Sequence, residues 1–419
     1  MNRCVAAVGM AWLASSCGAD VAPAVPAVPR EIVVVECEPQ TAQPTDAPAG
    51  DAKTTLGDDA VTLAREAFDD LPGWSSDRHA DAIPAFIASC DKLDDLPDQA
   101  AVGAAVYSGT ASQWRSACAA ARRVPVGDHE AARSFFEKQF HVYATGGRDG
   151  AEGKVTGYYV APLRGSRTRG GKYLFPLYAR PADLVSIQLD EFVPDGRSRR
   201  VWGKVDARLG TVVRYGDRKQ IRQQLTDDQA LLWVDDPVDA IHVEIEGSGR
   251  ARLDDGSEVW VGFAGKNGLR AGRNGAVMRA MRAFREAKAG APWTDRDLDA
   301  YYKISDAKRS IVFFALQQRG GAVGTQDVVL TGGRSVAVDR AVIPLSAPLW
   351  IDTTAPPAPG ERHAPWQRIV VAQDTGGAIL GSVRVDVYFG DDEDAGKIAS
   401  HVNGPGRVWV LLPTEIKVR

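Results

Sequence analysis

The strongest constraint on the fold of this chain is a set of short segments in which apolar and polar residues alternate. They lie beyond Lys154 and are separated by Gly, Pro, Asp and Asn. The clearest of these segments are residues 154–163, 173–181, 238–253, 257–268, 334–345 and 367–374. Alternation with a period of two predicts strands with one buried face, and many short strands with turn residues between them are typical of sandwiches and barrels. We therefore predict a mainly β fold for this part of the chain.

A helical pattern precedes the strands. Over residues 58–129, which we predict to be a helical lead-in, apolar residues recur three and four positions apart. The pattern continues to about Val142, and Asp128 stands where an N-cap residue belongs. We place the beginning of the folded part near Leu71. One more helical interval, residues 275–305, interrupts the strands.

The N-terminus predicts export. Residues 1–17 contain Arg3, an apolar run and then small residues, which is the layout of a secretory signal and is too short to span a bilayer. Cys17 follows the sequence LASS, which resembles the lipobox of bacterial lipoproteins, except that Ala14 stands where Leu, Val or Ile is usual. This resemblance implies lipidation of Cys17 and, because Gly18 rather than Asp follows, sorting to the periplasmic side of the outer membrane. Cleavage without lipidation is the alternative.

The cysteines and histidines predict neither a metal site nor a disulfide framework. Without Cys4, and with Cys17 committed to lipid, Cys37, Cys90 and Cys118 remain, so at most one bridge can form. Cys90 and Cys118 lie in neighbouring helical patterns, where they can pair or stay as two buried thiols. No Cys and His spacing indicates zinc, and we expect no metal and no cofactor.

Composition and charge limit the classes of function. The chain has 419 residues, of which 44% are hydrophobic, enough for two or three domains with cores of their own. Residues 18–57 are rich in Pro and Ala and predict an extended linker. The formal net charge of -4 and the pI of about 5.9 argue against nucleic acid, because a face that neutralises phosphates normally makes a domain strongly basic.

Aromatic residues and carboxylates in the β region favour carbohydrate as the ligand. Sugar C–H faces stack on rings and sugar hydroxyls bond to carboxylates, although we expect more than half of the rings to belong to the core. The rings are those of Tyr158, Tyr159, Tyr178, Trp202, Tyr215, Trp260 and Phe263. Residues 372–390 place Asp374 and Asp386 in a strand pattern, where an acid is costly unless it is exposed, paired or part of a site.

Several short motifs follow one another in a fixed order. They are TGYY at 156–159, GSR at 165–167, PLYARPADL at 176–184, EGSG at 246–249, GFAGKNG at 262–268, GRSVAVD at 333–339, AQDTGGAILGSVRVDVYFG at 372–390 and GRVWVLLP at 406–413. In this order they resemble the MltA-type membrane-bound lytic murein transglycosylases, and the resemblance covers residues 73–413. The motif at 372–390 is its most specific part.

The resemblance implies a double-psi β-barrel with a second, inserted β domain. The barrel, which is the catalytic domain, takes residues 130–162 and 321–419, and the insertion takes residues 163–320 and forms the other wall of a glycan groove. The family cleaves the β-1,4 bond between N-acetylmuramic acid and N-acetylglucosamine in peptidoglycan and leaves 1,6-anhydromuramoyl ends. The implied partners are peptidoglycan glycan strands, the membrane through a lipid on Cys17, and complexes of cell-wall synthesis or hydrolysis.

The family's catalytic aspartate falls on Asp386. A lytic transglycosylase needs only this acid, because the muramoyl C6 hydroxyl is an internal nucleophile. Asp386 first donates a proton to the glycosidic oxygen and then accepts one from O6, which requires a pKa raised toward neutrality. The predicted substrate-binding residues are Thr156, Tyr158, Glu246, Ser248, Asp374, Gly376 and Gly377. Asp374 orients its loop or binds hydroxyls, or else it forms a structural Asx turn.

Some residues depart from the family pattern and leave alternatives open. Glu246 stands where Gln is usual, and Val160 and Ala161 replace the usual Glu and Pro. A carboxylate at position 246 raises the pKa of Asp386 if the two are close, or impairs sugar binding. Two other functions fit the same residues. One is a non-catalytic peptidoglycan-binding lipoprotein, and the other is a cellulase-like hydrolase on the same barrel, which needs a second carboxylate to activate water.

Overall fold

The computed structural model describes residues 61–147, 150–189, 192, 200–270, 272, 274–288 and 290–418, together with the backbone of Thr54–Leu56. Cys17, the rest of the predicted signal and most of the linker lie outside the described residues. Residues 50–419 belong to one compact unit. Within the described part of the chain, no helix combines the length and the apolar character needed to cross a bilayer.

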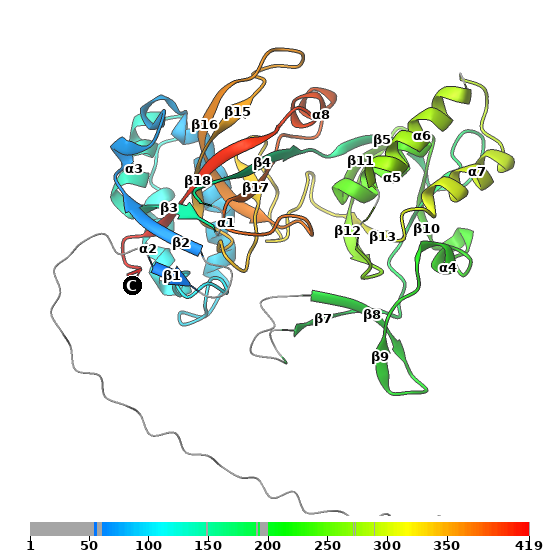
Figure 1. Ribbon diagram of the computed structural model, residues 1–419, viewed down its shortest axis with the longest axis horizontal. Coiled ribbons are helices and arrows are strands. Elements are labelled where there is room, and N and C mark those ends of the chain that lie inside the picture. Colours follow the sequence, from blue (N-terminus) through cyan, green and yellow to red (C-terminus); the bar gives the residue numbers. More distant parts are fainter. Residues whose placement is uncertain are drawn as a thin grey trace, which may run out of the picture. The chain divides into compact units, whose positions relative to one another are not determined.

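Six strands close into a barrel (Figure 1). In order around it they are β18, β15, β16, β14, β17 and β4, and β4 pairs again with β18. Their bounds are β4 (Glu152–Tyr158), β14 (Ser335–Ala337), β15 (Pro348–Ala355), β16 (Ala364–Asp374), β17 (Arg384–Tyr388) and β18 (Asn403–Pro413). The sheet continues beyond β18 through β3 (Phe140–Gly146), β2 (Val61–Glu66) and β1 (Thr54–Leu56). Closure leaves the strands that carry Thr156, Asp374 and Asp386 without free edges.

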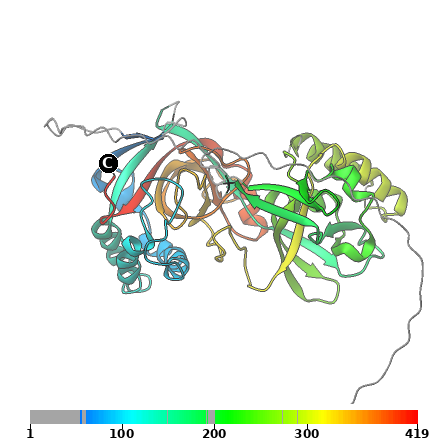
Figure 2. The same ribbon diagram turned by 90° about the horizontal axis from the view of Figure 1, so that it is seen from below.

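Three helices pack against this sheet, and both views show them gathered beside it (Figures 1 and 2). They are α1 (Ile83–Asp94), α2 (Ala111–Ala121) and α3 (His129–Gln139). Their apolar faces bury Phe86, Trp114 and Phe136, whose rings contact Phe140 of β3. The helices of the predicted lead-in therefore share a hydrophobic core with the sheet, through the ring of Phe140.

The sequence predicted where α3 begins and where the folded part of the chain begins. The predicted N-cap of α3 is confirmed, because Asp128 Oδ1 accepts a hydrogen bond of 2.9 Å from the N–H of Ala131. The fold begins earlier than the predicted Leu71, because β2 lies ahead of it and pairs with β3. Val61 and Leu63 alternate with more exposed residues and are buried, a signal too short to stand out in the sequence.

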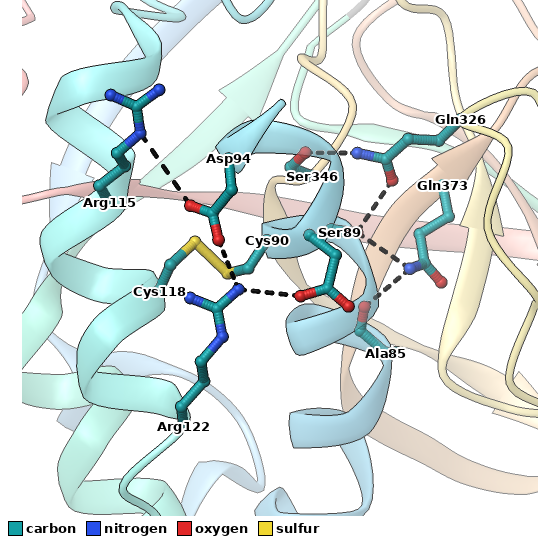
Figure 3. The surroundings of a disulfide bond; sticks show 11 residues. Ala85, Ser89, Cys90, Asp94, Arg115, Cys118, Arg122, Gln326, Ser346 and Gln373 are labelled. Atoms are coloured by element: carbon teal, nitrogen blue, oxygen red, sulfur yellow. Dashed lines mark hydrogen bonds and ion pairs between the residues drawn. A yellow bond between two sulfur atoms is a disulfide. The ribbon is translucent and has the colours of Figure 1, made fainter. Parts of the chain in front are cut away.

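A disulfide joins α1 to α2. Cys90 and Cys118 form it with their Cα atoms 5.5 Å apart, and both residues are fully buried (Figure 3). Of the two alternatives that the sequence left open, pairing is the one adopted. The bridge links positions 28 residues apart. A cross-link of that span stabilises a fold by about 2–4 kcal/mol.

The strands between β4 and β14 form two further sheets. The larger has the order β13, β12, β11, β5, β10, β6, and a lone bridge between Ala179 and Phe314 connects its two edges, so that it nearly closes. Its strands are β5 (Ala161–Ser166), β6 (Phe175–Tyr178), β10 (Ala230–Val234), β11 (Ser248–Leu253), β12 (Glu258–Lys266) and β13 (Val312–Gln317). The smaller sheet contains β7 (Leu184–Gln188), β8 (Arg200–Asp206) and β9 (Thr211–Val213).

Helices accompany these sheets and one follows β17. They are α4 (Arg218–Arg222), α5 (Pro237–Glu246), α6 (Asn274–Lys288), α7 (Asp295–Ser305) and α8 (Glu393–Ala399). Helices α6 and α7 confirm the helical interval predicted at 275–305. The predicted fold class is also confirmed: a mainly β chain with a helical N-terminal part, a double-psi β-barrel and a second β domain. The domain boundaries at 162/163 and 320/321 stay a prediction.

The strand prediction for residues 238–253 is wrong in its first half, which forms α5. Asp236 caps this helix by accepting hydrogen bonds from two backbone N–H groups, Pro237 occupies its first position, and Gly247 ends it with φ of 85°. These are strong helix signals. The apolar residues recur at intervals that suit either a strand or a helix, so the caps decide the outcome. As a result Glu246 lies at the end of a helix.

Candidate active site

Asp386 belongs to a row of residues that crosses four strands of the barrel. It lies opposite Thr156 of β4 on one side and opposite Ala337 of β14 on the other. Ala337 in turn lies opposite Asp374 of β16. Neighbouring strands are about 4.8 Å apart, so the Cα atoms of the two aspartates are separated by about 10 Å. The strand register thus brings Thr156 and both aspartates to one level of the barrel.

The carboxyl of Asp386 is only partly exposed, between the fully buried Val385 and Val387. Thr156 Oγ1 donates a hydrogen bond to Asp386 Oδ1, and Arg384 Nη1 donates to Thr156 Oγ1 over 2.8 Å. Burial raises the pKa of Asp386 to about 6, although the hydrogen bond from Thr156 and the charge of Arg384 act to lower it. Burial is the largest effect, so this carboxyl exchanges its proton near neutral pH, as an acid/base catalyst must.

Asp374, the last residue of β16, accepts four hydrogen bonds. Its Oδ1 accepts from the N–H and the hydroxyl of Thr325, over 2.9 and 2.8 Å, and from the N–H of Thr375 over 2.8 Å. Its Oδ2 accepts from the hydroxyl of Tyr158 over 2.8 Å. Burial, and then the charge of Asp374, raise the pKa of Tyr158 well above its ordinary value, so the phenol remains a donor. Every partner donates, so Asp374 is an acceptor that fixes the loop after β16.

Gln373, the residue before Asp374, ties the end of β16 to α1. It is fully buried, and its Nε2 donates to the carbonyl of Ala85 over 2.7 Å and to the hydroxyl of Ser89 over 2.9 Å (Figure 3). Its Oε1 accepts from the hydroxyl of Ser335 over 2.5 Å. The helical lead-in therefore holds the backbone that presents Asp374.

Glu246 is close enough to Asp386 for its charge to act there. Burial is the main cause of the raised pKa of Asp386, and the charge of Glu246 adds to it. The Oε1 of Glu246 lies 3.1 Å from Nε2 of His242, and Nδ1 of the same ring lies 3.4 Å from the hydroxyl of Tyr159. Ser248, which begins β11 two residues later, is half-buried.

The loop that follows Asp374 contains two glycines with different surroundings. A Cβ on Gly376 would come within 2.6 Å of Ile379 Cγ1, so a larger residue would displace the loop. A Cβ on Gly377 would lie 3.4 Å from Nζ of Lys266, a residue at the end of β12. Gly377 thus lies next to a cation of the second domain.

Two family models match separate parts of this chain. Residues 154–315 match the MltA specific insert domain, and residues 334–412 match the 3D domain. The solved lytic transglycosylase LtgG of Burkholderia pseudomallei is 31% identical over 88% of this chain and 100% of its own, with a TM-score of 0.53. This chain belongs to the MltA family. Its match to the 3D domain contains both Asp374 and Asp386.

Other members of the MltA family agree with this assignment. MltA from Neisseria gonorrhoeae is 27% identical, with a TM-score of 0.65, over 90% of this chain and 98% of that one. The membrane-bound lytic murein transglycosylase A of Escherichia coli K12 is 27% identical over 265 residues. That match covers 62% of this chain, which spans 65% of the length of this curated relative. A structure of E. coli MltA with bound chitohexaose, 23% identical over 79% of this chain and 89% of that one with a TM-score of 0.55, shares the fold.

The structure of this MltA-family chain brings together most of the predicted site residues. Thr156 contacts Asp386 directly, Tyr158 contacts Asp374, and Glu246 acts on Asp386 through its charge. Gly376 and Gly377 lie in the adjoining loop. Ser248 has no recorded interaction with Asp386 among the described residues, and the predicted lipidation site Cys17 lies outside them.

The sequence patterns missed three residues of the site. Arg384 and Gln373 lie within the motif at 372–390, where the only signal for Gln373 was a polar residue at a buried strand position. Thr325 lies outside every motif, so no local signal indicates its contact with Asp374. Within the described part of the chain, no group of three or more His, Cys, Asp or Glu side chains is arranged to hold a metal ion.

Replacing Glu246 with Gln is expected to move the pH profile of activity. The substitution removes a negative charge that raises the pKa of Asp386, so that pKa falls. A general acid works only while it is protonated, so the alkaline limb of kcat/KM against pH should move to lower pH by a fraction of a unit. Glu258→Gln, at an exposed position of β12, is the matched control. Identical profiles for all three proteins would contradict an effect of Glu246 on the acid.

Proposed function

We propose that this chain is a lytic transglycosylase that cleaves the β-1,4 bond between N-acetylmuramic acid and N-acetylglucosamine in peptidoglycan and forms 1,6-anhydromuramoyl ends. The observation that carries this proposal is the carboxyl of Asp386, whose pKa burial raises to about 6. The second aspartate of the same row, Asp374, has both oxygens occupied by hydrogen bonds. Membership of the MltA family supports it, and chitohexaose bound to E. coli MltA is a relative's example of a glycan ligand.

In the first half of the proposed reaction Asp386 acts as an acid. Oδ1 accepts the hydrogen bond from Thr156, which leaves Oδ2 to carry the proton. Oδ2 donates this proton to the glycosidic oxygen as the bond to muramoyl C1 breaks, and the developing positive charge at C1 is stabilised by the new carboxylate. Arg384 supports Thr156 in this arrangement.

In the second half Asp386 acts as a base. The C6 hydroxyl of the same muramoyl residue attacks C1, and the carboxylate accepts the proton from O6 as the anhydro ring closes. Because the nucleophile belongs to the substrate, its proximity replaces a bound water and a second carboxylate. We propose that the glycan is held by Thr156, Tyr158, Glu246, Ser248, Asp374, Gly376 and Gly377.

The two alternatives are less well supported. A hydrolase needs a second carboxylate to activate water or attack C1. Glu246 has its Oε1 3.1 Å from Nε2 of His242, and Asp374 is the other carboxylate of the row. Its oxygens accept from Thr325, Thr375 and Tyr158, so they are engaged in holding the loop. A non-catalytic lectin has no need for the raised pKa of Asp386.

Mass spectrometry of digested sacculi tests the proposal. The full chain should release muropeptides with anhydro ends, which are lighter by one water than those with reducing ends. Release of reducing ends would indicate the hydrolase, and binding to sacculi without release would indicate the lectin.

We also propose that lipid on Cys17 anchors the chain at the periplasmic side of the outer membrane. The lipobox-like sequence LASSC and the membrane-bound relatives support this location. Cys17→Ser should move the protein from the membrane to the soluble periplasmic fraction without changing its activity on soluble glycan strands. Membrane partitioning equal to that of the native chain would contradict the anchor.

A further inference from the structure

A cavity of about 340 Å³ lies between the smaller sheet and the end of β12. Trp202 of β8 lines it, and a Cβ on Gly268, just beyond β12, would come within 2.8 Å of the Trp202 carbonyl oxygen. The guanidinium groups of Arg180 and Arg200 lie 5.6 and 6.0 Å from the centre of the Trp202 ring. The backbone of Trp202 is therefore closely packed against Gly268. Its indole packs against Gly265, where a Cβ would come within 3.0 Å of the ring, and has cations beside it.

Among the described residues that line this cavity, the charged ones are all cations: Arg200, Arg214 and Lys266. Arg200 Nε donates a hydrogen bond of 2.7 Å to Oε1 of Gln188, and none of the three cations forms an ion pair with a carboxylate of the described residues. Burial lowers the pKa of Arg200, and the charges of Arg340 and Arg180 lower it further. Burial also lowers the pKa of Lys266. The positive charges around Arg200 repel one another, and an anion bound beside Arg200 relieves this repulsion.

Lys266 connects the cavity to the proposed active site. Its Nζ lies 3.4 Å from the position of a Cβ on Gly377, in the loop that begins at Asp374. An anionic group bound by Lys266 therefore lies beside the loop that Asp374 holds in place. A substrate whose glycan reaches Asp386 can place a charged branch here.

We propose that Lys266, Arg200 and Arg214 bind carboxylate groups of the peptide stems carried by the muramic acid residues of peptidoglycan. This inference rests on the proposed function, because it assigns a part of the same substrate to the cavity. The N-acetylated sugar backbone carries no charge, whereas the stems that extend from its lactyl groups end in carboxylates. Cations that have no acidic partner in the described part of the chain suit the carboxylates of the stems, and an aromatic side chain suits their apolar side chains.

The test compares one lysine substitution on two substrates. Lys266→Met keeps the length of the side chain and removes its charge, and Lys303→Met, on the exposed face of α7, is the matched control. The substrates are glycan strands with their stems and the same strands after an amidase has removed them. Amidase cleavage leaves a free carboxylate on each lactyl group, so both substrates are anionic and differ in whether their carboxylates lie along the stem or at the sugar. Lys266→Met should lower kcat/KM about 10- to 100-fold on strands with stems, mainly through KM, and less than about twofold on bare strands.

Arg214→Met provides a second, independent variant at an exposed position. Its kcat/KM should also fall on strands with stems and stay nearly unchanged on bare strands. Added salt should reduce the difference in kcat/KM between the native chain and the variant on strands with stems. Equal losses on both substrates would mean that Lys266 only supports the loop, and unchanged kinetics would mean that the cavity does not bind stems. Either result overturns the inference.

A calorimetric titration separates this inference from the proposed function. The native chain and Lys266→Met are titrated with a soluble disaccharide that carries a peptide stem and with the same disaccharide without it. Tighter binding of the first, lost in Lys266→Met, supports the subsite even if no product is ever released. Equal binding of the two disaccharides by the native chain contradicts the subsite even if transglycosylase activity is found.

Discussion

Replacing Asp386 with Asn should lower kcat for release of anhydromuropeptides by about 10³–10⁴-fold, the upper end of what the loss of an acid/base group costs. The amide has nearly the same shape, and its oxygen can still accept the hydrogen bond from Thr156. It can neither donate a proton to the glycosidic oxygen nor accept one from O6, so both halves of the reaction lose their catalyst. Steady-state kinetics on purified glycan strands, with circular dichroism to verify the fold, measures the effect.

Asp374→Asn is the matched control for this experiment. It makes the same change at the other aspartate of the row, where the carboxylate accepts hydrogen bonds from Tyr158, Thr325 and Thr375. An amide oxygen can satisfy some of these donors, so we expect a smaller loss that appears mainly in KM. If Asp374→Asn abolished activity and Asp386→Asn retained it, the assignment of the acid would have to be reversed.

Replacing Glu244 with Gln should reduce the free energy of unfolding by about 3–5 kcal/mol, because it leaves two buried cations without their anion. Glu244 of α5 is 8% exposed, Arg218 4% and Lys308 1%. Its Oε2 accepts a hydrogen bond from Arg218 and lies 3.1 Å from Nζ of Lys308. Burial acts to raise the pKa of Glu244, but Arg218 and Lys308 together hold it below the ordinary value.

Glu244 should also make the free energy of unfolding depend on pH, in a direction that its lowered pKa determines. A carboxyl whose pKa is lower in the folded state contributes stability above its ordinary pKa, and this contribution disappears as the pH falls through the folded value. Chemical denaturation at neutral and acidic pH measures both effects. Glu246→Gln, the same change two residues later at a half-buried position, should cost less than about 1 kcal/mol. Equal stabilities of the two variants would contradict the importance of the buried cluster.

The parts of the fold that could be predicted are those with a local cause. Alternating apolar residues predicted the strands around Asp386, and Asp128 predicted the beginning of α3 because a cap acts within one turn. The strand prediction for 238–253 is wrong in its first half because the apolar spacing there suits both a strand and a helix, and the caps at Asp236 and Gly247 make it a helix. Here the cap residues decide the secondary structure, and the spacing of apolar residues does not.

The parts of the site that could not be predicted depend on contacts between distant segments. Gln373 bonds to Ser89, which is 284 positions away, and Tyr158 bonds to Asp374, which is 216 positions away. Nothing near these residues in the sequence indicates such partners. The proposed mechanism required a raised pKa for Asp386, and burial is its main cause. The hydrogen bond from Thr156 and the charge of Arg384 act to lower this pKa, and these two effects could not be predicted without the folded barrel.

The central claim is that the nucleophile comes from the substrate and that Asp386 serves it as acid and then base. Digestion of glycan strands by the full chain in water enriched in heavy oxygen tests this most directly. If the C6 hydroxyl attacks C1, the new muramoyl ends contain no solvent oxygen, and mass spectrometry should find no label in them. Heavy oxygen at C1 of reducing muramoyl ends would show that water attacks instead, and it would contradict the proposed mechanism.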